Sequence, residues 1–224
     1  MRRTVDHGWG RIGLILLGAG RSTRFGRNKL AEPLLGVPMI RRTAAIYAAL
    51  PFARRVAVVG PSMPRLDDLG YSEGSVTEKG NPQSASLAAG IRLLDGVGMD
   101  GIMVALGDMP LVDLAHLEAL RHGFESSGLV CSSIGSARSP PAIFPIAARE
   151  QLMTLVGDQG ARNLLADAIC VPSNDSVLMD IDSMADFSKA AAILQRGFDC
   201  GNDADLVHLP FNDAPISAGS RDTE

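Results

Sequence analysis

Short runs of consecutive apolar residues alternate along the chain with segments whose apolar residues recur at helical spacing. The runs 12–17, 56–59 and 102–106 are typical of buried strands, because a strand covered on both faces loses its apolar–polar alternation. Residues 38–50 and 83–94 carry apolar side chains three and four positions apart, which predicts helices. This order predicts an α/β fold, a three-layer α/β/α Rossmann-like arrangement with a mainly parallel sheet.

The second half of the chain continues the pattern less regularly. We expect short strands at 129–132, 141–145 and 177–181, the second of them at a sheet edge because it contains prolines. The expected helices span 113–120, 147–156, 161–168 and 183–194. Asp113 is the expected N-cap of the first, and Ser183 with Asp186 forms a capping pair at the last.

The two ends of the chain lack any such periodicity. Residues 1–10 and 198–224 are rich in Asp, Gly, Ser and Pro, and we expect them to be disordered tails. The rest, residues 11–197, is long enough for one domain with a good core. The basic start is followed by only about six apolar residues, so no signal peptide is predicted.

Charge and composition exclude several classes of function. The net charge of −4 argues against a sequence-independent nucleic-acid binder. No apolar run approaches the roughly 20 residues of a membrane span. The three cysteines, Cys131, Cys170 and Cys200, are far apart in sequence without metal-ligand spacing, which favours free thiols in the cytoplasm. His116 and His122 are expected on a solvated helix face.

A glycine-rich loop with several cations follows the first predicted strand. Leu17-Gly18-Ala19-Gly20 ends the strand, and Arg21, Arg24, Arg27 and Lys29 come next. Glycines let main-chain N–H groups approach a phosphate, and the cations hold its charge. The segment lacks the Gly-Lys-Ser/Thr of a Walker loop and the third glycine of a dinucleotide fingerprint. It nevertheless favours a polyanionic ligand such as a nucleoside triphosphate.

Two groups of carboxylates follow predicted strands. Asp108 lies in Gly-Asp-Met-Pro just after the apolar run 102–106, at the edge where open α/β sheets bind ligands. Asp180 and Asp182 alternate at the end of the last predicted strand, which places both on one face. Carboxylates opposite a triphosphate suit Mg²⁺, so Asp108 and Asp182 are the predicted metal ligands. A turn role for Asp108 and a helix-opening role for Asp182 are the structural alternatives.

Two further sites lie at predicted helix starts. Gln83 and Ser84 open a helix, where Ser84 is either an N-cap or part of a nucleotide-binding N-terminus. Arg162 follows the turn at 157–161 and is the candidate for binding an anionic acceptor. No serine or cysteine nucleophile with a partner histidine is apparent.

With these residues in view, the chain resembles the molybdenum-cofactor nucleotidyltransferases, within the wider group of nucleotide-sugar-type pyrophosphorylases. The resemblance runs from about residue 14 to 194. Its main segments are 17–30, 83–90, 106–110 with the helix that follows, and 180–187; segments 141–144 and 157–162 are also similar.

The resemblance implies a role for each matching residue. Leu17, Gly18 and Ala19 would contact the base through the main chain, and Gly20, Arg21 and Arg24 would border the triphosphate. Lys29 would contact phosphate. Asp108 would hold Mg²⁺, and Asp182 would be the second residue on the metal side. Met184 and Ala185 replace the Pro-Glu that is usual in the family after Asp182-Ser183.

The resemblance also bears on the nucleotide. Family members that transfer guanylyl groups resemble Leu-Ala-Gly-Gly in the loop, and those that transfer cytidylyl groups resemble Leu-Ala-Ala-Gly. Ala19 follows the cytidylyl pattern, whereas Gly18 departs from both. The hypothesis is therefore a Mg²⁺-dependent enzyme that transfers CMP from CTP to the molybdenum cofactor, with a client molybdoenzyme as a further partner. GTP as the donor, a sugar or polyol phosphate as the acceptor, and a non-catalytic cofactor carrier or chaperone are the alternatives.

Overall fold

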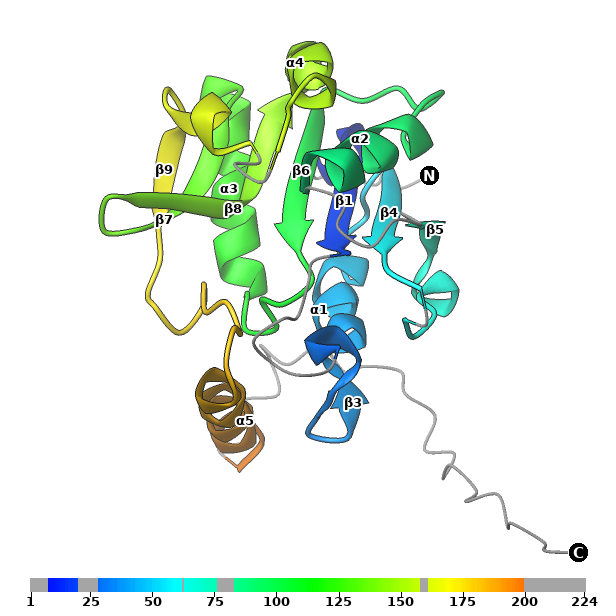
Figure 1. Ribbon diagram of the computed structural model, residues 1–224. Helices are drawn as coiled ribbons and strands as arrows, with labels where there is room; N and C mark the ends of the chain where they lie inside the picture. Colours follow the sequence, from blue (N-terminus) through cyan, green and yellow to red (C-terminus); the bar gives the residue numbers. More distant parts are fainter. Residues whose placement is uncertain (1–7, 20–27, 62, 76–82, 158–160, 200–224) are drawn as a thin grey trace, which may run out of the picture.

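A seven-stranded sheet forms the centre of the computed structural model, with helices on both of its faces (Figure 1). The structure describes residues 8–19, 28–61, 63–75, 83–157 and 161–199. The strand order is β5-β4-β1-β6-β8-β7-β9. The strands are β1 (Ile12–Gly18), β4 (Arg54–Val59), β5 (Tyr71–Ser75), β6 (Gly101–Leu106), β7 (Val130–Ile134), β8 (Ala137–Pro145) and β9 (Ile169–Pro172).

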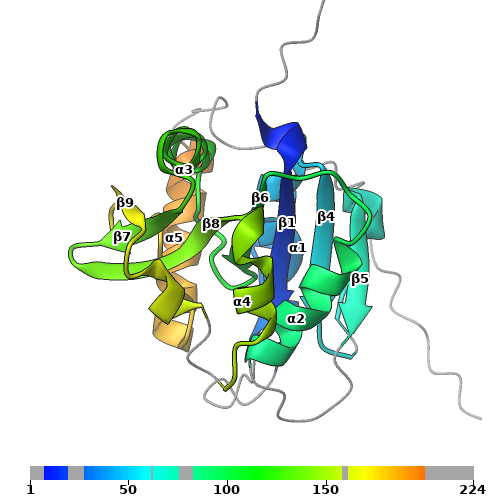
Figure 2. The same cartoon turned by 90° about the horizontal axis from the view of Figure 1, so that it is seen from above.

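The helices divide between the two faces of the sheet (Figure 2). Leu14 and Leu16 of β1 belong to the apolar cluster that includes side chains of α1, α3 and α5, whereas Ile15 and Leu17 belong to the cluster with α2 and α4. Every residue of β1 is buried, as expected for a strand covered on both sides. The helices are α1 (Met39–Ala48), α2 (Gln83–Leu93), α3 (Leu114–Ser127), α4 (Arg149–Met153) and α5 (Met184–Asp199).

Strand direction is uniform except at β8. Strand β8 pairs antiparallel with both β6 and β7, and the other neighbouring pairs in the sheet are parallel. The predicted α/β/α fold with a mainly parallel sheet is thereby confirmed. A small hairpin of β2 (Pro33–Leu34) and β3 (Val37–Pro38) precedes α1.

The prediction that 141–145 forms an edge strand is wrong, because β8 lies inside the sheet between β6 and β7. The pairing with β7 shifts register between Cys131 and Ser132: Cys131 faces Ala142, and Ser132 faces Ser139. Pro140 and Pro141 fall in the bulge between these pairs, where no ladder N–H is required of them. The prolines therefore mark a bulge and not an edge.

The prediction of a strand at 177–181 is also wrong, since these residues form turns and irregular chain. The helix expected at 147–156 is divided into the 3₁₀ turn η4 (Ile146–Ala148) and α4, and that expected at 161–168 is only the 3₁₀ turn η5 (Arg162–Leu165). The caps are confirmed: Asp113 accepts from the His116 amide, and Ser183 and Asp186 bond reciprocally at the start of α5.

His116 and Trp9 lie deeper than the sequence suggests. His116 is only 7% exposed, so the expectation of a solvated helix face is wrong for it, whereas His122 is exposed. His116 Nε2 lies 2.8 Å from the Ser132 hydroxyl, which donates to the Pro141 carbonyl in the bulge. Trp9, placed by sequence in the N-terminal tail, is buried in the 3₁₀ turn η1 (Trp9–Arg11), and its indole N–H donates to Glu118.

Candidate active site

The site is built where β1 and β6 end side by side. Leu17 pairs with Leu106, and the Gly107 amide donates to the Leu17 carbonyl at 2.9 Å. A Cβ on Gly107 would lie 2.4 Å from the end of the Ile40 side chain and 3.3 Å from the Leu17 oxygen, so a larger residue would have to push Ile40 aside and crowd this carbonyl. The buried Thr43 hydroxyl of α1 shares its one proton between the Gly107 carbonyl at 3.0 Å and the Met39 carbonyl of its own helix at 3.1 Å. The backbone that carries Asp108 is thus held on two sides.

Lys29 lies at the centre of an acidic group. It begins the 3₁₀ turn η2 (Lys29–Ala31), which the Asn28 side chain caps. The Lys29 Nζ atom lies 2.8 Å from Asp108 Oδ2, 2.9 Å from Asp182 Oδ1 and 3.9 Å from Asp180 Oδ1. It also donates to the Ile181 carbonyl at 2.7 Å. The structure therefore brings Lys29, Asp108 and Asp182 together, as their proposed common role requires.

The two carboxylates at 180 and 182 are held by the residue between them. Ile181 is fully buried, and its amide donates to the Asp108 carbonyl at 3.1 Å. Its own carbonyl accepts from Lys29. Although the segment is not a strand, the bond to Asp108 holds it beside the end of β6 and the bond from the Lys29 side chain holds it to that lysine, with both aspartates turned toward the lysine.

The charges in this group alter each other's ionisation. Burial and the nearby Asp108 carboxylate raise the pKa of Asp180 to about 7, because both disfavour a further negative charge. Burial alone would lower the pKa of Lys29. The Asp108 carboxylate and the other acidic neighbours outweigh that effect, and the pKa of Lys29 is raised.

The acidic group has the chemistry of a divalent-cation site. Asp108, Asp180 and Asp182 each offer an oxygen within 4.8 Å of the others. Asp108 Oδ1 is buried and has no hydrogen-bond partner within the described part of the chain. A buried carboxylate oxygen left unpaired is costly, and carboxylate oxygens are the ligands that Mg²⁺ prefers. The residues present therefore fit a bound divalent metal.

The structure describes only some of the other predicted site residues. Leu17 and Gly18 end β1 and Ala19 follows them at the same edge of the sheet, while Gly20, Arg21 and Arg24 lie outside the described residues. Gln83 and Ser84 form the first turn of α2, and Ser84 is only 5% exposed. Arg162 begins η5, but its side chain is outside what the structure describes.

Sequence reasoning left two residues of this region without a role. Asp180 was noted as half of an acidic pair but was not assigned to the metal, since spacing alone does not show where side chains point in an irregular segment. Thr43 carried no signal, because a threonine within a helical pattern is ordinary. Only the fold shows that its hydroxyl reaches the end of β6.

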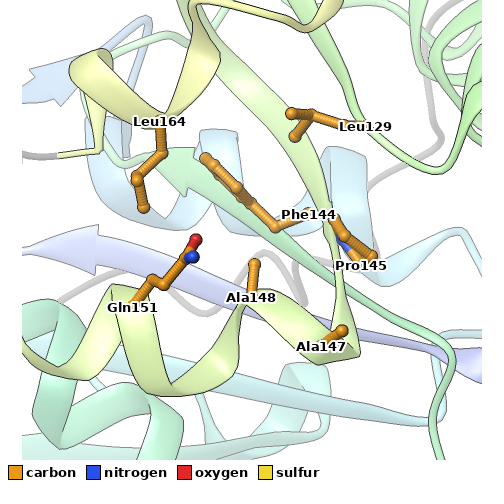
Figure 3. A pocket seen from close by; sticks show the side chains of 7 residues that line it. All are labelled: Leu129, Phe144, Pro145, Ala147, Ala148, Gln151 and Leu164. Atoms are coloured by element: carbon orange, nitrogen blue, oxygen red, sulfur yellow. The ribbon is translucent and has the colours of Figure 1, made fainter.

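A separate cavity of about 250 Å³ lies near the other ends of the strands, where β8 ends (Figure 3). Phe144, Leu164 and Gln151 line it, with Gln151 as a polar group at its side. The neighbouring Pro145 pairs with Gly101, the first residue of β6, whereas Asp108 follows the last. This mainly apolar cavity is therefore distinct from the acidic group.

Comparison with known proteins identifies the family and agrees with the fold. Residues 14–174 match the family model of the MobA-like NTP transferase domain. The purine catabolism protein PucB of Bacillus subtilis is 31% identical over 205 residues, which cover 77% of this chain and 92% of that protein. A 2-C-methyl-D-erythritol 4-phosphate cytidylyltransferase of Cereibacter sphaeroides is 30% identical over 138 residues, which cover 58% of this chain and 56% of that protein.

Solved structures show the same fold at lower identity. The homologue of Mycobacterium tuberculosis Rv0371c from Mycobacterium sp. strain JC1 superposes with a TM-score of 0.71 at 22% identity, covering 84% of this chain and 98% of that one. The complex of Rv0371c with manganese superposes with a TM-score of 0.67 at 21% identity, covering 81% and 98%.

No helix within the described ranges has the length and apolar character that crossing a membrane requires. The matched region extends from the middle of β1 to just beyond β9 and includes Lys29 and Asp108. The chain belongs to the MobA-like NTP transferase family and is a nucleotidyltransferase.

Proposed function

We propose that the protein is a Mg²⁺-dependent cytidylyltransferase that transfers CMP from CTP to the phosphate of the molybdenum cofactor and releases pyrophosphate. The observation that carries this proposal is the meeting of Lys29 with Asp108, Asp180 and Asp182 beside the glycine-rich end of β1. A cation and a metal-binding acidic group at this edge are what a triphosphate reaction needs.

In this reaction an oxygen of the acceptor phosphate attacks the α-phosphorus of CTP. The bond between that phosphorus and the bridging oxygen breaks, and pyrophosphate leaves with the bond electrons. The acceptor already carries its nucleophile, so the protein needs none of its own. Positioning and charge neutralisation are the main contributions left to the side chains.

We assign roles to the side chains from the family resemblance, supported by position where the structure describes them. Asp108 and Asp182 would hold Mg²⁺, with Asp180 adjacent. When bound, Mg²⁺ would neutralise charge on the triphosphate and the leaving pyrophosphate. Lys29, Arg21 and Arg24 would hold phosphate oxygens, and Gln83 and Ser84 at the start of α2 would contact the nucleotide. Arg162 would bind the anionic acceptor.

The choice of CTP rests on the loop after β1. Main-chain groups of Leu17, Gly18 and Ala19 would read the edge of the base, and the Ala19 methyl group would limit its size. The cytidylyltransferase among the relatives supports a cytidine nucleotide. The name of that relative gives the phosphate of a sugar alcohol as its substrate, so a polyol phosphate is the second candidate acceptor.

A matrix of donors and acceptors tests the proposal. The protein is incubated with CTP or GTP, Mg²⁺, and either the molybdenum cofactor or a polyol phosphate, and pyrophosphate release is measured. Mass spectrometry then identifies the nucleotidylated product. Release with CTP and the molybdenum cofactor supports the assignment. Release only with a polyol phosphate would show that the acceptor is a polyol phosphate and not the molybdenum cofactor. The absence of release with every pair of donor and acceptor would refute the proposal.

A further inference from the structure

The Lys29 ammonium occupies the space between the carboxylates that the metal would use. An ammonium has three N–H donors, and Lys29 Nζ has Asp108 Oδ2, Asp182 Oδ1 and the Ile181 carbonyl within 2.9 Å. The lysine side chain is only 11% exposed. Lys29 is therefore directed into the acidic group, and two of its contacts are metal-ligand candidates.

We infer that Lys29 is the counter-ion of this acidic group in the protein without metal, and that it competes with the divalent cation for Asp108 and Asp182. The inference rests on the proposed metal role of these residues. It goes further by assigning Lys29 a function before any nucleotide arrives, in addition to its contact with phosphate.

Electrostatics gives the competition its direction. The carboxylate oxygens lie within 4.8 Å of each other, so a cation that binds them comes close to Nζ. Two neighbouring positive charges repel, and the positive charge of Lys29 already offsets part of the acidic charge. A metal that binds alone, whether at the unpaired Asp108 Oδ1 or at the oxygens that Lys29 contacts, therefore has to overcome repulsion from the ammonium or take its place. Of the three close contacts, the uncharged Ile181 carbonyl is the one that does not compete for the metal.

A triphosphate changes this balance, because its oxygens offer Lys29 new acceptors. When the ammonium moves to phosphate, Asp108 and Asp182 are released to the metal. Binding of nucleotide and metal then favour each other, as reciprocal coupling between two sites requires. Lys29 acts in this respect as a positioning residue for the metal site.

Measuring Mn²⁺ affinity in the absence of nucleotide tests the inference. Free Mn²⁺ is followed by electron paramagnetic resonance in the wild-type protein, in Lys29→Met and in Lys189→Met. The last makes the same change at an exposed lysine on α5. We expect Lys29→Met to bind Mn²⁺ about tenfold more tightly than wild type, within the usual range of coupling between sites. Lys189→Met should match wild type.

Thermal unfolding supplies a second readout, which remains informative if the variant folds poorly without metal. Without metal, Lys29→Met should unfold at a lower temperature, because three carboxylates face each other without their counter-ion. Saturating Mn²⁺ should raise its Tm by more than it raises that of wild type. If Lys29→Met is unfolded without metal, it should fold when Mn²⁺ is added.

Three results would overturn the inference: Mn²⁺ affinity in folded Lys29→Met equal to or weaker than in wild type, a Tm gain from Mn²⁺ no larger than that of wild type, or a variant that stays unfolded at saturating Mn²⁺. These measurements use neither nucleotide nor acceptor. A wrong assignment of CTP or of the molybdenum cofactor would leave them unchanged, so failure of the inference and failure of the proposed function are distinguishable.

Discussion

The main-chain amide of Ile181 donates a hydrogen bond to the main-chain carbonyl of Asp108, 3.1 Å away. This bond joins the end of β6 to an irregular segment near the start of α5. It is a backbone interaction, so it holds Asp180 and Asp182 near Asp108 without depending on the charges of the three side chains. The acidic group can therefore stay assembled while its ionisation or its bound cation changes.

Replacing Asp108 with asparagine should reduce turnover about a hundredfold or more. The shape is nearly unchanged, but the charge that holds Mg²⁺ is lost. A metal ion contributes several kcal/mol to charge stabilisation, and each ~1.4 kcal/mol is a factor of ten in rate. Pyrophosphate release is the measurement, with circular dichroism as the check on the fold. Activity close to that of wild type would show that Asp108 is only a turn residue.

Ala19→Gly should increase the relative use of GTP. If the Ala19 methyl group limits the size of the base, the wild-type enzyme should prefer CTP about tenfold or more in kcat/KM, since an unmatched buried polar group costs about 1–3 kcal/mol. Removing the methyl group relaxes this limit. The ratio of kcat/KM for the two nucleotides is the measurement, and equal values in the wild-type enzyme would mean that this loop does not select the base.

Thr43→Val should destabilise the fold by about 1–3 kcal/mol, because the buried hydroxyl that the Gly107 and Met39 carbonyls share is lost while the side-chain shape is kept. Urea denaturation measures the change. Thr154→Val is the matched control, since Thr154 is exposed, and it should change stability by less than about 0.5 kcal/mol. Similar effects of the two substitutions would remove any special role for Thr43.

The contribution of His116 to stability should fall as the pH decreases through the range in which it titrates, whereas Asp180, whose pKa is raised, should act in the opposite direction. Burial lowers the pKa of His116, with the charge of Asp113 acting in the opposite direction. Below the unfolded pKa of about 6.5, the unfolded chain thus binds a proton that the folded protein binds less readily, and folding loses up to about 1.4 kcal/mol per pH unit. Denaturation curves measured between about pH 7.5 and 5.5, a range around the ordinary pKa of histidine, give the slope of the free energy of unfolding against pH.

The comparison for this prediction is between two histidines of the same helix. His116→Gln should remove the His116 contribution and make the slope of stability against pH less positive, whereas His122→Gln, at an exposed position, should leave the slope unchanged. An unaltered slope in His116→Gln would assign the effect to other groups.

Some of the fold could be predicted from sequence because its signals are local. The apolar runs of β1 and β6 identified two central strands, and side-chain caps at Asp113 and Ser183 marked two helix starts. Strands β5 and β9 were missed, because they are edge strands whose residues are mostly exposed and show no apolar run. The prolines of β8 led to the wrong prediction of an edge strand. An interior strand tolerates them only at a bulge, and this bulge depends on the pairing with β7, which the sequence does not show.

The site, like the fold, has residues that could be predicted from sequence and residues that could not. Lys29, Asp108 and Asp182 could be selected because each stands in a recognisable motif, and the structure brings them into contact. The position of Asp180 depends on the hydrogen bonds that the Ile181 main chain makes with Asp108 and with the Lys29 side chain, and the contact of Thr43 depends on the packing of α1 against the end of β6. Such relationships are made only by the folded chain, so spacing along the sequence does not contain them.

Trp9 gives the protein a built-in optical reporter. It is the single tryptophan of the chain, it is 1% exposed, and its ring meets Phe52 edge to face with 4.8 Å between centroids. Its fluorescence in the native state should be that of a tryptophan shielded from water, and the emission should shift to longer wavelength when the protein unfolds. Trp9 precedes the start of β1, whereas the acidic group lies beyond the ends of β1 and β6. This fluorescence should therefore report global unfolding and change little when a ligand binds at the acidic group.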